Sequence, residues 1–332
     1  MSARIDDVVR WGLLSTAAIN GPVLDGCAGS STVRFAAVAS RNADKASAFA
    51  RAHGIPRAYG SYEELLADPD VEAVYVSLPN ALHLEWSRRA LEAGKHVLCE
   101  KPLGIDPDEV GLAFDAAAGA ERRLVEAFMY RFHPQTEQLR QLVAAGAIGS
   151  VRLVRATLSF TMTAPETDVR SSVELDGGAL MDLGCYCANA FRLFAGEPRL
   201  VQAHAVEAAS GVDMRFVGTL VGADGAVGQF DCAMDLPRRD LLELVGSEGT
   251  IVVPDPWHCR GEPFELRRGD ECRRVATPAA DAYRVQFETV SRAIRDGRPL
   301  EFGRDDAIAQ ATVLSALRAS ARTGAPTRVG MA

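Results

Sequence analysis

The most constraining feature of the sequence is the regular alternation of short apolar runs and amphipathic segments in its first third. The apolar runs have the length and composition of buried strands, and the segments between them have helical periodicity and end at glycines such as Gly54 and Gly94. Because βαβ crossovers are right-handed, this alternation favours a doubly wound, Rossmann-like parallel sheet with helices on both faces. The predicted strands are Val8–Leu14, Val33–Ser40, Val71–Leu78, His96–Cys99 and Leu124–Ala127. The predicted helices are Ala17–Gly26, Ala43–Gly54, Tyr62–Ala67, Leu82–Gly94 and Asp106–Gly119.

The pattern changes near residue 126, where predicted strands begin to follow one another in series. We therefore expect an α/β chain with a Rossmann domain at 1–125 and an α+β domain at 126–332, built on a mostly antiparallel sheet. The elements predicted in the second part are a helix at Thr136–Ala145, a long strand at Val151–Met162, a helix at Gly177–Phe194, a β-rich stretch at Leu200–Val253, and closing helices at Ala282–Asp296 and Asp305–Ala321.

The composition argues against nucleic acids and membranes as partners. The 332 residues carry a net charge of −8 and contain no basic run of the kind that binds nucleic acid. No apolar run reaches the roughly 18 residues that a membrane-spanning helix needs. Val8–Leu24 is apolar-rich, but Asp6 and Asp7 interrupt the basic segment that precedes the apolar run of a signal peptide, so we expect a strand that enters a helix.

The cysteines indicate a reducing compartment. There are seven, an odd and scattered set, which fits free thiols in the cytoplasm better than a disulfide framework. Cys185 and Cys187 form the one close pair, but C-x-C without a second cluster is poor zinc spacing. We therefore expect both to be small packing residues, and we expect a cytoplasmic protein without a metal site.

The stretch RWGLLSTAAIN, from Arg10 to Asn20, lies where a nucleotide-binding βαβ unit has its glycine-rich turn. The three glycine positions of G-x-G-x-x-G fall on Ser15, Ala17 and Asn20. Backbone N–H groups and the helix dipole hold the pyrophosphate in such turns, and the glycines serve geometry. This turn is therefore able to bind a dinucleotide if it avoids positive φ. A plain strand-to-helix turn is the alternative interpretation.

The end of the second predicted strand bears on cofactor choice. NAD enzymes tend to place an acidic residue there for the ribose 2′-hydroxyl, whereas this strand ends at Ser40 and Arg41, with Lys45 one turn later. An Arg fork suits a 2′-phosphate, so the sequence favours NADP(H), with NAD(H) as the alternative. The other interpretation is an ordinary surface arginine, because 33 of the 36 basic residues are Arg.

The stretch GKHVLCEKPLG, from Gly94 to Gly104, places chemistry at the edge of the predicted sheet. Glu100, Lys101 and Pro102 follow a strand at its carboxyl end, where open α/β sheets bind ligands. A lysine in a chain that otherwise uses arginine indicates a need for a compact donor with an adjustable pKa. A cis form of the bond before the proline is able to fix where Lys101 points.

Three later stretches also place polar side chains within or next to predicted helices and strands. GGALMDLGCYCANAFRLF begins at Gly177, and within it Asp182 and Tyr186 are four residues apart, which places them on one helix face. EAFMYRFHPQ, from Glu126 to Gln135, follows the fifth predicted strand, and TDVRSS ends at Ser172.

Together these motifs resemble the glucose–fructose oxidoreductase / inositol dehydrogenase / MocA (Gfo/Idh/MocA) family of NAD(P)-dependent oxidoreductases. The E-K-P motif and the G-G…D-x-G-x-Y pattern are specific to it, and the resemblance spans nearly the whole chain. The resemblance implies a Rossmann domain followed by an α/β domain whose large open sheet often forms the subunit interface. We therefore expect a homodimer or a homotetramer that assembles through the C-terminal sheet.

The resemblance also bears on the missing glycines. The family branch that has Tyr at the end of the G-G pattern often carries a turn of the form G-[IL]-[LIV]-[GS]-T-A-x-I. The segment from Gly12 to Ile19 is similar to it. The cofactor residues that this implies are Gly12, Ser15, Thr16, Ala17, Ala18 and Ile19, together with Ser40, Arg41 and Lys45 from the second strand.

By the same resemblance, Lys101 hydrogen-bonds the reacting oxygen and Tyr186 gives or takes the proton, while Asp182 orients Lys101 or substrate hydroxyls. A neighbouring ammonium favours the ionised form of a phenol, so the pair is chemically reasonable. The residues expected to bind the cofactor near the nicotinamide and its ribose are Leu78, Pro79, Asn80, His83, Glu100 and Lys101 itself. Candidate substrate contacts are Arg170 and His133, the latter equally interpretable as a structural turn residue. The loops Pro165–Ser172 and Pro254–Pro263 are expected to shape the pocket or its rim.

Together, the motifs and the resemblance predict an NADP(H)-dependent oxidoreductase that moves a hydride between the nicotinamide and a carbinol or ketone of a sugar-like substrate. It would act as a ketosugar reductase or a sugar dehydrogenase. Oxidation of a cyclic trans-diol, as in trans-dihydrodiol dehydrogenases, is a second interpretation. A dinucleotide-binding regulator without turnover is a third, but such a protein has no need of the Lys101 and Tyr186 pair.

Overall fold

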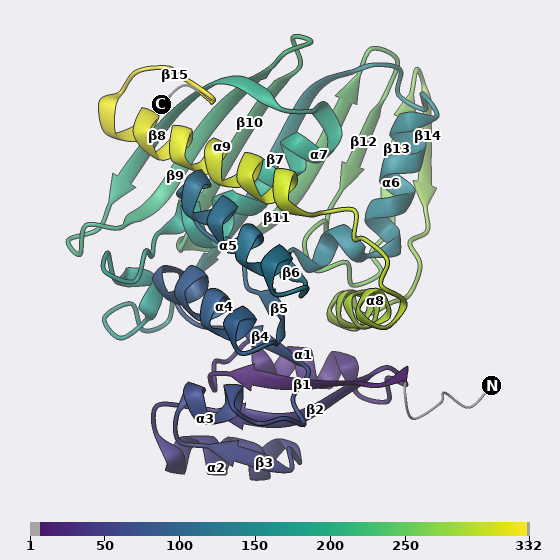
Figure 1. Cartoon of the computed structure of the whole chain (residues 1–332). Helices are drawn as coiled ribbons and strands as arrows, with labels where there is room; N and C mark the ends of the chain where they lie inside the picture. The colour runs from purple at the N-terminus through teal and green to yellow at the C-terminus, as the bar shows by residue number, and fades with distance from the viewer. Residues whose placement is uncertain (1–6, 331–332) are drawn as a thin grey trace. The chain divides into compact units, whose positions relative to one another are not determined.

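The computed structural model of the protein describes residues 7–330 and divides the chain into two compact units (Figure 1). The first unit takes the chain up to Met129 together with Asp281–Ile308. The second takes Tyr130–Ala280 and the chain from Ala309 onward. Each unit has its own sheet and its own buried core. The helix α9 (Arg304–Thr323) contributes residues to both.

The first unit is built on a six-stranded parallel sheet in the order β3-β2-β1-β4-β5-β6. This is the strand order of a doubly wound dinucleotide-binding fold, with the change of direction between β1 and β4. Its strands are β1 (Val9–Leu14), β2 (Val33–Ala39), β3 (Arg57–Tyr59), β4 (Ala73–Val76), β5 (His96–Cys99) and β6 (Leu124–Glu126). Its helices are α1 (Asn20–Cys27), α2 (Ala43–His53), α3 (Tyr62–Leu66), the 3₁₀ turn η2 (Asn80–Leu82), α4 (His83–Glu92), α5 (Pro107–Gly119) and α8 (Ala282–Asp296).

Helix α8 belongs to the first unit although it comes late in the sequence. Phe287 is fully buried there among aromatic rings of the sheet, 4.8 Å from the Trp11 ring, 5.2 Å from Tyr75 and 5.5 Å from Phe35. Ser291 accepts a hydrogen bond from the Trp11 indole N–H at 3.1 Å. These contacts explain why the structure groups Asp281–Ile308 with the Rossmann sheet, whereas we expected one continuous second domain at 126–332.

The second unit is built on a nine-stranded mixed sheet in the order β14-β13-β12-β11-β7-β10-β9-β8-β15. The β7–β10 pair is parallel and the other pairs are antiparallel. Its strands are β7 (Val151–Thr161), β8 (Pro198–Glu207), β9 (Asp213–Gly222), β10 (Val227–Ala233), β11 (Asp235–Gly246), β12 (Thr250–Val253), β13 (Phe264–Arg268), β14 (Glu271–Val275) and β15 (Thr327–Arg328). Its other helical elements are α6 (Pro134–Ala144), the 3₁₀ turn η4 (Val169–Ser171), the π turn η5 (Leu180–Gly184) and α7 (Cys185–Ala195). A further 3₁₀ turn, η3 (Met129–Phe132), spans the division between the units.

The predicted fold class is confirmed, since a parallel Rossmann sheet is followed by a large, mostly antiparallel sheet. Two local expectations need correction. The short strand β3 was not predicted, because its three residues carry no alternating pattern. The helix expected over Gly177–Phe194 begins at Leu180 instead, and it begins as a π turn before α7 starts at Cys185. Among residues 7–330, the structure shows no helix with the length and apolar character needed to cross a membrane.

The packing of α8 gives a prediction about stability. Replacing Phe287 by Ala should cost about 3–5 kcal/mol of unfolding free energy, because a fully buried ring leaves a cavity among three aromatic neighbours. Urea denaturation measures this cost. The control is Leu112→Ala on α5, where the side chain is 55% exposed and the change should stay within about 0.5 kcal/mol. Equal effects of the two substitutions would contradict the placement of α8 in this core.

Candidate active site

The turn after β1 has a conformation that normally requires glycine. Ser15 has a φ of 130°, so the turn does not meet the condition that we set for it, namely that it avoid positive φ. Its Oγ lies 2.9 Å from both the carbonyl oxygen and the hydroxyl oxygen of Ser77, and it accepts from the Ala17 N–H at 3.1 Å. These hydrogen bonds offset the backbone strain, which is how the turn forms without its first glycine.

The residues after Ser15 leave the backbone of the turn accessible. Helix α1 begins at Asn20, and the side-chain amide of this buried residue donates to the Ser15 carbonyl at 2.9 Å. The residues between them are half-buried or exposed and mostly small: Thr16, Ala17, Ala18 and Ile19. Backbone N–H groups at a helix N-terminus attract anions, so these residues fit the pyrophosphate of a dinucleotide.

Gly12 has a different place from the other residues of this motif. It lies inside β1 and is buried, and a Cβ on it would come within 2.7 Å of a methyl group of Leu65 in α3. Its glycine is therefore explained by the close approach of α3 to the strand.

The end of β2 presents the residues predicted to choose the cofactor. Ser40 is buried and its hydroxyl accepts from the Asn42 N–H at 3.3 Å, whereas Arg41 and Lys45 are exposed. The Asn42 side chain caps α2 by accepting from the Lys45 N–H at 2.9 Å. Burial raises the pKa of Tyr62, and its hydrogen bond with Arg41 opposes that shift. Arg41 and Lys45 thus place two cations beyond the strand end, which fits a 2′-phosphate.

His83 acts as a structural link between two loops of this edge. It is fully buried, and its ring nitrogens lie 2.8 Å from the carbonyl oxygens of Leu78 and Pro102. Both ring nitrogens of His83 thus lie within hydrogen-bonding distance of backbone carbonyl oxygens. Of its predicted companions after β4, Leu78 is buried while Pro79 and Asn80 are half-buried at the start of η2.

The loop after β5 is fixed by carboxylates on both sides of Lys101. The hydroxyl of Tyr75 donates to Glu100, and the carboxylate of Glu126 accepts from the Leu103 N–H at 2.8 Å. The Lys101–Pro102 peptide bond is cis, as the sequence allowed, and the Lys101 side chain is half-buried. A polar residue that sequence reasoning missed also lies here. Burial and the charge of Glu100 raise the pKa of Tyr283 in α8, while Lys101 lowers it.

In the second unit, an ion pair joins two predicted site residues. The Arg170 Nε lies 3.1 Å from Asp182 Oδ2, and Arg170 Nη1 lies 3.2 Å from Asp168 Oδ2. The guanidinium also lies over the Phe160 ring, 5.2 Å from its centroid. Asp182 and Arg170 are half-buried, so the pair keeps contact with solvent. The loop Pro165–Ser172 is thus connected to the π turn that carries Asp182.

Tyr186, in the first turn of α7, is held among aromatic rings. It is 7% exposed, and its ring centroid lies 5.9 Å from that of Tyr130 and 5.8 Å from that of Trp257. The Trp257 indole N–H donates to the Thr157 carbonyl at 3.1 Å, and the Tyr130 hydroxyl donates to Asn189 at 2.5 Å. Trp257 comes from the segment Pro254–Pro263, so part of that segment supports the predicted proton donor. The one tryptophan of the segment, Trp257, was the feature of the sequence that could have indicated this packing role.

His133 has a structural role at the start of α6. It is fully buried, its Nδ1 accepts from the Gln135 N–H at 3.0 Å, and its Nε2 lies 3.1 Å from the Ala280 carbonyl. This geometry is that of a helix cap, which matches the second of the two roles that we considered for it.

Cys185 and Cys187 are also buried, and burial raises the pKa of the Cys187 thiol well above its usual value.

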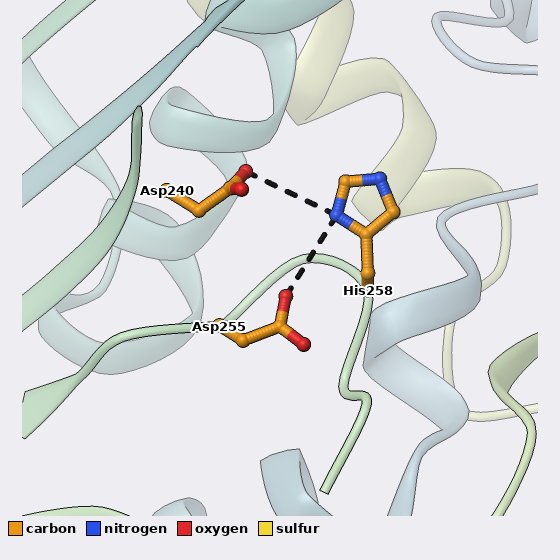
Figure 2. Close-up of side chains that lie close together, drawn as sticks. All are labelled: Asp240, Asp255 and His258. Carbon is orange, nitrogen blue, oxygen red and sulfur yellow. Dashed lines mark ion pairs between the residues drawn. The ribbon is translucent and has the colours of Figure 1, made fainter. Parts of the chain in front are cut away.

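The side chains of Asp240, Asp255 and His258 converge in the second unit (Figure 2). His258 Nδ1 lies 3.9 Å from Asp240 Oδ1 and 3.8 Å from Asp255 Oδ1. Arg238 Nη2 is 3.2 Å from the same His258 nitrogen, and Arg260 Nε lies 3.1 Å from Asp255 Oδ2. Burial raises the pKa of Asp255, but Arg260 outweighs it and the net shift is downward. Two arginines thus neutralise the two carboxylates, and this ion-pair network secures the Trp257 segment against β11.

Comparison with known proteins places these features in a family. The model for the NAD-binding Rossmann fold of the oxidoreductase family GFO/IDH/MocA matches residues 21–128, and the model for its C-terminal domain matches residues 136–252. The chain belongs to this family. The assignment confirms the predicted class of protein, a nicotinamide-dependent oxidoreductase that acts on CH–OH groups.

Two curated relatives are informative. The chain is 38% identical over 321 residues to D-xylose 1-dehydrogenase (NADP(+)) 2 of Haloferax volcanii, a match that covers 96% of this chain and 98% of the relative. It is 40% identical over 227 residues to the trans-1,2-dihydrobenzene-1,2-diol dehydrogenase of Danio rerio, which covers 67% of each.

Solved structures are similar over nearly the whole chain. The 3-ketoreductase KijD10 of Actinomadura kijaniata, in complex with NADP and TDP-benzene, has a TM-score of 0.89 at 30% identity and covers 94% of this chain and 98% of its own. An aldose–aldose oxidoreductase of Caulobacter crescentus complexed with glycerol has a TM-score of 0.89 at 27% identity and covers 97% of this chain and 100% of its own.

The conformation of Ser15 gives a second prediction. Ser15→Ala keeps a side chain at positive φ and loses the hydroxyl, whereas Ser15→Gly loses the hydroxyl but relieves the strain. The alanine variant should therefore be less stable than the glycine variant by about 1 kcal/mol, as measured by urea denaturation. The matched control is Ser87 inside α4, where the order should reverse because glycine is about 1 kcal/mol worse than alanine in a helix. The same order at both positions would contradict the account of the turn.

Proposed function

We propose that this protein transfers a hydride between NADP(H) and a carbinol or ketone of a sugar or sugar-like substrate, as a ketosugar reductase or a sugar dehydrogenase. The observation that carries the proposal is the loop after β5, which presents Lys101 at the carboxyl edge of a dinucleotide-binding sheet. Hydrogen bonds to Glu100 and Glu126 hold this loop in place and fix the backbone on both sides of Lys101. The relatives that act on D-xylose and on 3-keto groups support the substrate class.

NADP(H) is proposed as the preferred cofactor. The turn at Ser15–Ile19 accommodates a pyrophosphate, and Arg41 and Lys45 supply the positive charge that a 2′-phosphate needs. Two relatives support this choice, since one carries NADP(+) in its name and the other was solved with NADP.

In this proposal a bound nicotinamide would supply or accept the hydride. The residues of the chain stabilise the charge on the substrate oxygen and transfer its proton. Negative charge develops on the oxygen of a carbonyl that receives a hydride, and the Lys101 ammonium stabilises it. Tyr186 gives the proton in the reductive direction and takes it in the oxidative direction. Asp182, held by Arg170, accepts hydrogen bonds from substrate hydroxyls and so sets their orientation.

A second candidate activity is oxidation of a cyclic trans-diol. It is favoured by the identity to a trans-1,2-dihydrobenzene-1,2-diol dehydrogenase and uses the same Lys101 and Tyr186 chemistry. A probe panel separates the candidates: D-xylose and trans-1,2-dihydrobenzene-1,2-diol, each with NADP⁺ or NAD⁺, and a TDP-linked 3-keto sugar with NADPH or NADH. A regulator without turnover would bind NADPH and leave every member of the panel unchanged.

Assembly through the nine-stranded sheet and a cytoplasmic location complete the proposal. One face of the sheet exposes Val206, Val217 and Leu241. Acidic and basic side chains on β7, β10 and β11 pair with each other, as in the 2.7 Å contact between Arg239 Nη1 and Asp231 Oδ2. A face with apolar residues and internally paired charges suits a second copy of the chain, as a homodimer or within a homotetramer. The cysteines of residues 7–330 are thiols and not disulfides, which fits a reducing cytoplasm.

The catalytic proposal predicts a loss of turnover without a loss of cofactor. Lys101→Met and Tyr186→Phe should each lower kcat/KM by about 10²–10⁴ on whichever member of the panel is turned over, because each removes a group that acts in the transition state. NADPH affinity, measured by fluorescence titration, should stay within about threefold. Tyr59→Phe is the matched control, since that hydroxyl only donates to Asp68. Wild-type activity in the Lys101→Met variant would overturn the mechanism.

The cofactor proposal predicts a selective loss of NADPH affinity. Arg41→Ala should weaken NADPH binding by about ten- to a hundredfold, because a charged hydrogen bond to the 2′-phosphate contributes roughly 1.5–3 kcal/mol. NADH binding should change by less than about twofold. Arg51→Ala, an exposed arginine on α2, is the matched control and should affect neither. A parallel loss for NADH and NADPH would show that Arg41 does not read the 2′-phosphate.

A further inference from the structure

The helical segment that carries Asp182 and Tyr186 starts at a turn with no space for side chains. A Cβ on Gly177 would lie 2.2 Å from the Arg170 carbonyl oxygen, and one on Gly178 would lie 2.1 Å from the Oδ1 of Asp213. Gly178 also has a φ of +109°. The turn is therefore enclosed by the backbone of the Arg170 loop on one side and by the Asp213 carboxylate on the other.

Asp213, the first residue of β9, makes a direct contact with the start of the π turn. Its Oδ2 accepts a hydrogen bond of 2.6 Å from the backbone N–H of Leu180, the first residue of η5. A carboxylate at this point satisfies an N–H that would otherwise lack a helical partner, and it suits the positive end of a helix dipole. The contact connects the nine-stranded sheet to the segment two residues before Asp182.

The same turn connects to the candidate substrate loop. The Gly178 N–H donates to the Arg170 carbonyl at 2.9 Å, while the Arg170 guanidinium pairs with Asp182 at 3.1 Å. Arg170 is thus bound to the segment at both its backbone and its side chain. A displacement of the turn would shift the Asp182–Arg170 pair and the first turn of α7 together.

We propose that Asp213 is a positioning residue, which holds the Leu180 N–H over Gly178 and so fixes Asp182, Arg170 and Tyr186 for the reaction. The inference rests on the proposed function, since it assigns these three side chains to the reacting substrate. Asp213 acts through the backbone and touches none of the reacting atoms.

The ionisation of Asp213 offers a readout that a purely structural residue would not give. Burial raises its pKa to about 6, and the Leu180 N–H, its own N–H and Arg318 on α9 oppose that shift, while Glu207 on β8 adds to it. Arg318 is itself paired with Asp176 at 2.7 Å. The carboxylate is a stronger acceptor than the carboxylic acid, so the contact weakens as pH falls through about 6.

The test uses Asp213→Ala and Asp213→Asn in the full chain. Asp213→Ala should lower kcat about ten- to a hundredfold with NADPH affinity unchanged, because a displaced catalytic group costs rate more than binding. Asp213→Asn keeps an oxygen that accepts from Leu180 and should retain kcat within about threefold at pH 7.5. Wild-type kcat should in turn fall by up to about threefold as pH drops through about 6, because the neutral carboxylic acid, like the amide, is a weaker acceptor than the carboxylate, and Asp213→Asn should not show this fall. An alanine variant with wild-type kcat, or identical pH profiles for the wild type and the asparagine variant, would overturn the proposal.

Hydrogen exchange separates this inference from the proposed function. Amide exchange of a peptide covering residues 178–186 should be faster in Asp213→Ala than in the wild type, with no change in peptides from the Rossmann sheet. If no member of the probe panel is turned over by the wild type, the proposed function fails, and exchange alone then decides whether Asp213 holds the segment. If Asp213→Ala does not fold, the pH profile of Asp213→Asn decides. Unchanged exchange in a folded Asp213→Ala variant would show that the contact holds nothing in place.

Discussion

The hydrogen bonds between Ser15 and Ser77 are the contacts on which the cofactor half depends. They join the ends of β1 and β4, the two central strands at which the direction of the sheet changes, and they hold Ser15 at a φ of 130°. In a parallel sheet every strand presents its carboxyl end at the same edge, so the loop with Lys101 follows β5 at that edge as well. The hydrogen bonds of the Ser15 hydroxyl thereby allow a positive φ at the position where the usual turn has glycine.

Much of this half could be predicted from the sequence, because its information is local. Apolar runs separated by amphipathic segments determine a doubly wound sheet, and the E-K-P stretch directly follows one of those runs. The cis form before Pro102 and the exposed Arg41 were likewise within reach of local rules. The backbone angle of Ser15 was not, since it is stabilised by Ser77, a residue 62 positions away. The condition that we set, that the turn avoid positive φ, took only the residues of the turn into account.

The second unit shows where sequence reasoning ends. Tyr186 could be identified through its place in the G-G…D-x-G-x-Y pattern, but the rings of Tyr130 and Trp257 that surround it come from distant segments. Asp213 has no motif, and its role appears only when β9 is placed against the start of η5. Likewise, the sequence offered His83 and His133 as candidate cofactor and substrate residues, and nothing in it indicated that both ring nitrogens of each would be directed at backbone groups. Long-range packing decides such roles, and periodicity carries no information about it.

The central claim is that a hydride moves directly between a carbinol carbon and the nicotinamide. The decisive measurement incubates the protein with NADP⁺ and either D-xylose deuterated at every carbon, C1 included, or the matching deuterated trans-diol, and determines the mass of the NADPH by mass spectrometry. The account predicts NADPH that is heavier by one deuterium, formed by the wild type and absent with Lys101→Met. Unlabelled NADPH from a deuterated substrate, or no turnover of any member of the probe panel in either direction, would contradict it.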